Sequence, residues 1–118
     1  AAGKSERAIE RALTMPHRAP LVVVVVASPK AHPNVPVFDQ QLCAGGAVLM
    51  MQMAARALGY GGVWRSGWLM YDSGFHAELG LAEQEQIVGF LYLGTPDESK
   101  AEPQPAPAAA AADLLRWL

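Results

Sequence analysis

The feature that most constrains the fold is an uninterrupted apolar run, Leu21–Ala27, which contains five consecutive valines. β-branched side chains favour extended backbone, and a strand without polar residues on either side has both faces buried. Prolines bound the run, because Pro20 precedes it and Pro29 follows shortly after it. The sequence therefore predicts a central strand that is covered on each face.

A second apolar segment, Val37–Leu58, has a helical pattern with almost no polar face. Beyond position 41 its only strongly polar side chains are those of Gln52 and Arg56. A membrane-spanning helix needs about 20 apolar residues, and the uninterrupted part, Leu42–Met51, is about half that length, so we expect no span. A helix that is apolar nearly all round is buried on all sides. We therefore expect a central helix or one at a dimer interface.

The residue types within and just after this helix predict where it packs and where it ends. Free cysteine is usually buried, so we expect Cys43 to be a small core residue, and we expect the cluster Met50-Met51-Met53 to provide adaptable core packing. Gly45-Gly46 indicates a place where another backbone packs closely. Gly59 suits the left-handed position that closes a helix.

Shorter elements are predicted on either side of these two. An amphipathic helix is expected over Ala1–Leu13 with Ser5 as its cap, and a brief helix capped by Asp72 or Ser73. The segment Glu85–Gly94 contains an alternating and apolar run that predicts a second strand.

The outline is α/β or α+β in one domain over residues 1–96. A Pro- and Ala-rich tail with an apolar end follows over residues 97–118.

Composition limits the classes of function. The charged fraction is 17%, below the usual value of about 25%, which indicates that a partner covers part of the surface. A net charge of -2 argues against binding to a nucleic-acid backbone. A single cysteine excludes an intrachain disulfide and fits a reducing, cytoplasmic location.

No residue pattern indicates acid–base, covalent or metal catalysis. The three histidines lie in separate segments without the i,i+4 spacing of a metal site, and the acidic residues near position 80 have the pattern of a solvated face. If the chain belongs to an enzyme, we therefore expect a cofactor to carry the reaction.

One segment stands apart, because Gly61–Gly67 combines flexible backbone, a planar aromatic, a fixed cation and a hydroxyl within seven residues. Glycines permit the close approach of a flat ligand, and Arg65 and Ser66 supply donors for its carbonyl or anionic edge. The alternative is a glycine turn that feeds an edge strand with Arg65 at the surface. The residues alone leave both interpretations open.

Four motifs occur in a fixed order along the chain, and they are His17-Arg18-Ala19-Pro20, Met51-Gln52-Met53-Ala54-Ala55, Gly61–Gly67 and Ile87–Pro96. Together they resemble the nitroreductase family, and in particular a small bacterial branch of NAD(P)H nitroreductases. Their order and spacing match the C-terminal two-thirds of that family, over about Ser5 to Pro96 of this chain.

The resemblance implies an α+β fold, with a mixed sheet flanked by helices, that forms an intertwined homodimer. It implies two FMN sites at the subunit interface. NAD(P)H would reduce FMN, and a nitroaromatic, quinone or similar small molecule would then accept the electrons in the same pocket, by a ping-pong mechanism.

The resemblance also assigns residues by position. Trp64, Arg65 and Ser66 match the family's second FMN segment, which lies along the isoalloxazine ring, and Arg65 would stabilise negative charge on reduced flavin. A nicotinamide-nucleotide segment of relatives falls on Ala54, Ala55, Arg56, Ala57, Leu58 and Gly59. Those residues close a helix, whose exposed carbonyls repel phosphate.

The family's main FMN-phosphate motif, an N-terminal Arg-Arg-Ser type sequence, does not occur in this chain, although Lys100 is a possible phosphate partner. We expect a fragment of a longer protein, since residue 1 is Ala, rather than a truncated relative with weakened flavin binding. The alternatives are a non-catalytic dimeric scaffold or ligand-binding module that lacks a complete flavin site, and a plain α/β binding domain.

Overall fold

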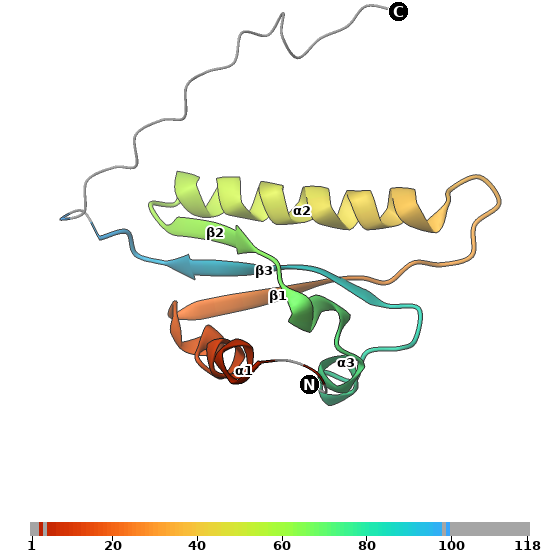
Figure 1. Ribbon diagram of the computed structural model, residues 1–118. Helices are drawn as coiled ribbons and strands as arrows, with labels where there is room; N and C mark the ends of the chain where they lie inside the picture. The colour runs from red at the N-terminus through yellow and green to blue at the C-terminus, as the bar shows by residue number, and fades with distance from the viewer. Residues whose placement is uncertain (1–2, 4, 98, 100–118) are drawn as a thin grey trace, which may run out of the picture.

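The computed structural model describes residues 3, 5–97 and 99. Its strands, β1 (Leu21–Ala27), β2 (Gly61–Arg65) and β3 (Gln86–Gly94), form one sheet in the order β1-β3-β2. The long helix α2 (Val37–Ala57) covers one face of this sheet, and the shorter helices α1 (Glu6–Leu13) and α3 (Ser73–Glu78) lie at the other (Figure 1). Two 3-10 helices, η1 (Met15–His17) and η2 (Trp68–Tyr71), complete the fold. The predicted α+β class is confirmed.

The resemblance implies a mixed sheet, but both strand pairs among the described residues are antiparallel. The expectation of a mixed sheet is therefore wrong for this part of the chain. β1 and β2 run in the same direction and are joined through α2, but β3 lies between them. Because β3 enters in the opposite direction, no two parallel strands become hydrogen-bonded neighbours. The one irregularity in the ladders is a register shift between Val25 and Val26.

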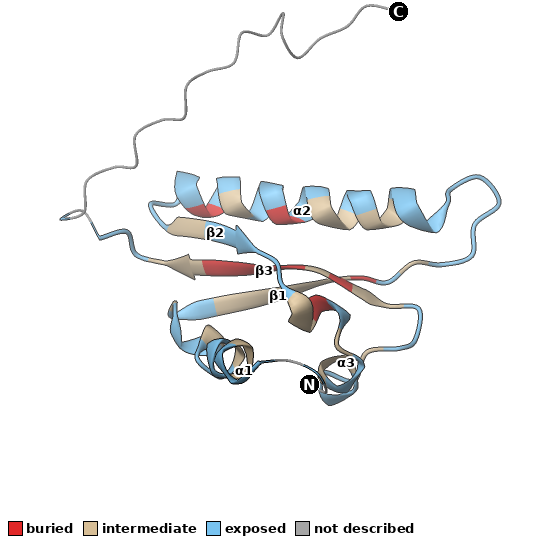
Figure 2. Ribbon diagram, in the orientation of Figure 1, coloured by how far each residue is buried: buried red, intermediate tan, exposed pale blue. Residues whose placement is uncertain are grey.

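The central strand is β3, not the valine-rich β1, and the prediction of a central strand over Leu21–Ala27 is wrong for the described residues. Most of β3 is buried, with Ile87 and Leu91 fully enclosed, whereas Leu21 is 54% exposed and the valines are half-buried (Figure 2). An apolar run predicts a strand that can be buried on both faces, but it does not specify which strands pair on its two edges.

Helix α2 forms as predicted but is not buried on all sides. Val48 and Ala55 are buried against the sheet, and the opposite side of the helix is exposed. We define the outer face of α2 by its exposed large apolar residues, which are Val37, Phe38, Leu42, Leu49, Met50, Met51 and Met53. No element among the described residues covers this face.

The expectation of core positions for Cys43 and the methionine cluster is therefore corrected. Cys43 is exposed, and Met50 and Met53 are 65% and 59% exposed. The expected backbone contact at Gly45-Gly46 is not seen either. A Cβ on Gly45 would lie 3.6 Å from the ring of Trp64, and one on Gly46 would meet nothing within 4 Å.

The local signals at helix ends are confirmed. The Ser5 hydroxyl accepts a hydrogen bond from the Ala8 amide at 3.3 Å, and the Asp72 carboxylate accepts one from the Phe75 amide at 2.9 Å. Gly59 follows α2 with a φ of 85°, the left-handed conformation expected there. Residues 98 and 100–118, with most of the predicted tail and Lys100, lie outside the described residues. Within the described residues, no helix has both the length and the apolar character that crossing a membrane requires.

Side chains of β3 alternate between the two faces of the sheet and so divide the core in two. Phe90 and Tyr92 pack with Met70 on the face that carries α1, α3 and η2, and the rings of Phe75 and Phe90 lie 6.2 Å apart. Leu91 points to the α2 side, where it lies near Gly62 together with Gln52. This division decides where the candidate site residues lie.

Candidate functional site

The predicted segment Gly61–Gly67 lies on β2, at one edge of the sheet. Its backbone pairs with β3 on one side, from Gly61 opposite Gly94 to Arg65 opposite Phe90, and the described residues place no strand on the other side. The alternative of a glycine turn that feeds an edge strand therefore describes the backbone correctly. A free strand edge also presents N–H and C=O groups to a ligand, so both interpretations survive.

Trp64 points to the α2 face of the sheet. Its indole ring lies over Gly89 of β3, where any Cβ would collide with the ring nitrogen, and beside Gly45 of α2. Trp64 is 41% exposed and lines a cavity of about 600 Å³ together with Leu42, Gly46 and Tyr71. We call this the Trp64 cavity. Gly89 is thus the residue that allows the ring to lie flat on the sheet, a requirement that the strand pattern alone does not reveal.

A hydrogen bond fixes α2 against β2. The side-chain nitrogen of Gln52 donates to the carbonyl oxygen of Gly62 at 2.9 Å. A Cβ at Gly62 would lie 3.1 Å from both Gln52 and Leu93, so the strand approaches the helix closely at this glycine. This contact accounts for Gln52, a half-buried polar side chain in the apolar part of the helix, and sequence reasoning assigned it no role.

Arg65 and Ser66 lie on the opposite side from Trp64. Successive residues of a strand point to opposite faces, so Arg65 faces α1 and lines a different cavity of about 320 Å³. Ser66, just past the end of β2, lines the same cavity. The structure therefore brings the side chains of Arg65 and Ser66 together and separates them from the Trp64 ring. What the three residues share is their backbone, which lies along the open edge of β2 and just past its end.

Hydrogen bonds hold the segment after Gly67 against the central strand. The carbonyl oxygen of Met70 in η2 accepts a hydrogen bond from the Gln86 side chain at 2.7 Å, and Nε2 of His76 lies 2.8 Å from the same oxygen. Met70 and Gln86 line the Trp64 cavity, whereas Trp68 and Leu69 of the same 3-10 helix line the cavity beside Arg65, so η2 forms one wall of each.

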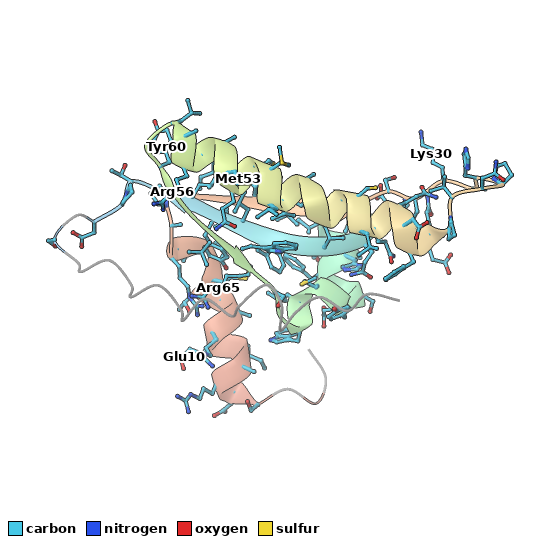
Figure 3. All side chains as sticks on the ribbon, turned by 90° about the horizontal axis from the view of Figure 1, so that it is seen from above. Glu10, Lys30, Met53, Arg56, Tyr60 and Arg65 are labelled. Carbon is cyan, nitrogen blue, oxygen red and sulfur yellow. The ribbon has the colours of Figure 1, made fainter. Side chains whose placement is uncertain are left out.

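The predicted nucleotide segment, Ala54–Gly59, lies apart from both cavities at the C-terminal end of α2, where Figure 3 shows Arg56 and Tyr60. The amides of Leu58, Gly59 and Tyr60 donate to carbonyls of the last helical turn at 2.9 to 3.1 Å. These bonds close the helix. Its C-terminal end carries the negative partial charge of the helix dipole, which disfavours phosphate. Arg56 and Gly59 nevertheless line a cavity of about 720 Å³ with Arg18.

Two carboxylates, those of Asp72 and Glu85, have lowered pKa values because they accept hydrogen bonds. The amide of Phe75 lowers the pKa of Asp72 by hydrogen bonding to its ionised form, which caps α3. The pKa of Glu85 is lowered by the amide of Ala82, at 2.9 Å, and by the hydroxyl of Ser28. Both groups stabilise turns at the ends of elements. In the part of the chain that the structure describes, no group of three or more His, Cys, Asp or Glu side chains is placed to hold a metal ion.

Comparison with known proteins gives consistent matches. Residues 3–95 match the model of the Nitroreductase family. The chain is 50% identical over 96 residues to the "Putative NAD(P)H nitroreductase YdjA" of Escherichia coli strain K12, and 37% identical over 100 residues to the "Putative NAD(P)H nitroreductase" of Haemophilus influenzae. These matches cover 81% and 82% of the chain but 52% and 53% of the relatives, so the chain spans about half their length.

Solved structures share the fold at lower sequence identity. A nitroreductase-like family protein from Bacillus cereus is similar with a TM-score of 0.75 at 22% identity, over 98% of this chain and 61% of that one. A mutant of NfnB from Sphingopyxis sp. strain HMH, described as an FMN and NADPH-dependent nitroreductase, is similar with a TM-score of 0.63 at 21% identity, over 98% of this chain and 52% of that one.

Proposed function

Because this chain belongs to the nitroreductase family, we propose that it forms part of an FMN-dependent oxidoreductase that moves electrons from NAD(P)H to nitroaromatic or quinone-like acceptors. The observation that carries the proposal is the open edge of β2, where the backbone of residues 64–66 is accessible beside a large cavity. The names of the relatives support the reaction class.

The residues present fit the ring portion of a flavin. The Trp64 cavity, at about 600 Å³, falls within the roughly 300–1,000 Å³ that small-molecule sites occupy. The edge of β2 offers backbone donors and acceptors in the plane of the sheet, and Arg65 and Ser66 extend from its end. For the phosphate group we assign no residue on this face of the sheet.

In this proposal each residue has a distinct task. The backbone of residues 64–66 binds the polar edge of the ring, Trp64 shields the ring from water on the α2 side, and Arg65 stabilises negative charge. When bound, FMN supplies the redox chemistry, accepting two electrons from NAD(P)H and passing them to the acceptor in a ping-pong sequence.

The nicotinamide nucleotide is assigned to Ala54–Gly59 on the resemblance. Within that segment Arg56 is the one charged donor, and its exposed side chain faces the same cavity as Arg18. The carbonyl-rich end of α2 opposes a phosphate there, so this assignment depends on Arg56. An Arg56→Ala variant that leaves the KM for NAD(P)H unchanged would contradict it.

We further propose a cytoplasmic homodimer. The outer face of α2 supports the dimer, since seven large apolar side chains are exposed on one helix and a second copy would remove them from water. The low charged fraction is consistent with a covered surface.

The test is a visible absorption spectrum of the purified chain after incubation with FMN and dialysis. We expect a retained flavin band, and bleaching of that band when NAD(P)H is added. Arg65→Ala should weaken FMN affinity about tenfold or more, because a charge-assisted contact is lost, whereas Lys30→Ala should not change it. Figure 3 shows Lys30 at the opposite end of α2 from Arg56 and Tyr60. A chain that stays colourless, or equal affinities for both variants, would contradict the proposed FMN site.

A further inference from the structure

Four arginines from separate parts of the chain line the same cavity. Arg7 and Arg11 lie one turn apart on α1, Arg18 follows η1, and Arg65 ends β2. The cavity has a volume of about 320 Å³ and lies on the face of the sheet opposite α2. We call it the arginine cavity. The whole chain has nine lysines and arginines and a net charge of -2, so this convergence is not a consequence of a basic composition.

Among the described residues, no carboxylate lines this cavity. The acidic residues of α1, Glu6 and Glu10, are not among its lining residues. Within the described residues, the guanidinium groups of Arg7, Arg11 and Arg65 make no hydrogen bond or ion pair, whereas Nη2 of Arg18 donates to the carbonyl of Arg11 at 3.2 Å. Like charges that share a cavity repel one another, and a bound anion would relieve that repulsion.

The rest of the lining suits an organic ligand rather than a bare ion. The hydroxyl-bearing residues Ser5 and Ser66 stand at the cavity with the arginines, and the buried side chains of Phe90 and Tyr92 form its floor on β3. A ligand with an apolar body and an anionic end would satisfy both parts of the lining.

We propose that the arginine cavity binds a small organic phosphate that carries two or more negative charges. The planar guanidinium group holds phosphate oxygens through two parallel hydrogen bonds, and several such groups favour a multiply charged phosphate over a single carboxylate. The Trp64 cavity lies on the other face of the sheet, and Arg7, Arg11 and Arg18 have no role in the proposed flavin site. Arg65 is common to both proposed sites, so the tests below change Arg7 and Arg11.

The first test uses pyrophosphate as the probe and isothermal titration calorimetry on the full chain at low ionic strength. Arg11→Gln and Arg7→Gln should each weaken binding about tenfold or more, since each removes one charge-assisted contact. Glutamine keeps the helix propensity of α1, and both positions are exposed, so the fold is preserved. Lys30→Gln, which removes the same charge from a distant loop, should change binding less than about twofold.

Competition then identifies the source of the phosphate. Displacement of pyrophosphate by NADPH but not by NADH assigns the cavity to the extra phosphate of the dinucleotide, and displacement by neither assigns it to a free organic phosphate. The proposal is overturned if the wild-type chain binds pyrophosphate no more tightly than about 1 mM, or if Lys30→Gln weakens binding as much as Arg11→Gln. Either result would show only general attraction between charges. Loss of pyrophosphate binding together with unchanged FMN binding in Arg11→Gln would separate this site from the flavin site.

Discussion

The two faces of the sheet differ in how their side chains are used, although the same strands build both. On the α2 side, Trp64 lies flat on Gly89 beside Gly45, and its cavity is mostly apolar. On the other side, Arg65 joins three more arginines over a floor formed by Phe90 and Tyr92. Neighbours in the sequence therefore belong to different sites, and the open edge of β2 lies between the two faces.

The largest expected changes in stability come from shortening a buried side chain in the core layer on each face of the sheet. Phe90 is 1% exposed and packs in the aromatic layer beneath the arginine cavity, whereas Leu91 is fully buried on the α2 side. We expect Phe90→Ala to lower the free energy of unfolding by about 3–5 kcal/mol and Leu91→Ala by about 2–5 kcal/mol. Urea denaturation followed by circular dichroism measures both. A smaller loss for Phe90→Ala than for Leu91→Ala would show that the α2 layer contributes more to stability.

A smaller effect tests the tight packing on the α2 face alone. A Cβ at Gly89 collides with the Trp64 indole, so Gly89→Ala should lower the free energy of unfolding by about 1–3 kcal/mol and shift the tryptophan fluorescence to longer wavelength. Gly46→Ala is the matched control, because a Cβ there meets nothing and alanine stabilises a helix interior by roughly 0.5–1 kcal/mol. Equal stability changes of the same sign would refute the placement of Trp64.

The elements of the fold could be predicted from sequence because their signals are local. The caps at Ser5 and Asp72, the left-handed Gly59 and the strand β3 all follow from residues within one turn or one strand. The order of strands is not local. The valine run and β3 are both apolar enough to be central, and only the chain path after α2 places β3 between β1 and β2.

The candidate site could be predicted only in part. The residue types of Gly61–Gly67 indicated a ligand, and period-two alternation could have shown that Trp64 and Arg65 face opposite ways. The i,i+4 spacing of Arg7 and Arg11 could also have shown that they share one side of a helix, but the sequence analysis did not use it. Their convergence with Arg65 depends on how α1 packs against the sheet, which no local pattern encodes.

The pH dependence of stability concerns α3, on the face opposite α2. The folded state lowers the pKa of Asp72, so this group stabilises the fold above its unfolded pKa of about 3.9 and loses that contribution as the pH falls through the lower, folded value. Asp72→Ala should therefore lower the melting temperature by a few degrees between pH 6 and 8, and the difference from wild type should shrink below about pH 4. Asp72→Asn keeps the capping oxygen without the charge, so its stability should lack this acid-dependent change. A constant difference between wild type and Asp72→Ala down to pH 2 would contradict the role of the ionised cap.

The smallest expected effect on stability belongs to the outer face of α2, and it sharpens the contrast between this face and the packed one. Met53 is 59% exposed, so Met53→Gln should change the free energy of unfolding by no more than about 0.5 kcal/mol in dilute monomer. The same change should weaken self-association if a second copy covers this face, because it removes apolar area from the contact. Sedimentation velocity at micromolar concentration would show the variant shifting towards monomer, with Lys30→Gln as a control on the same molecule. An unchanged sedimentation profile for Met53→Gln would mean that the apolar side chains of α2 face something other than a copy of this chain.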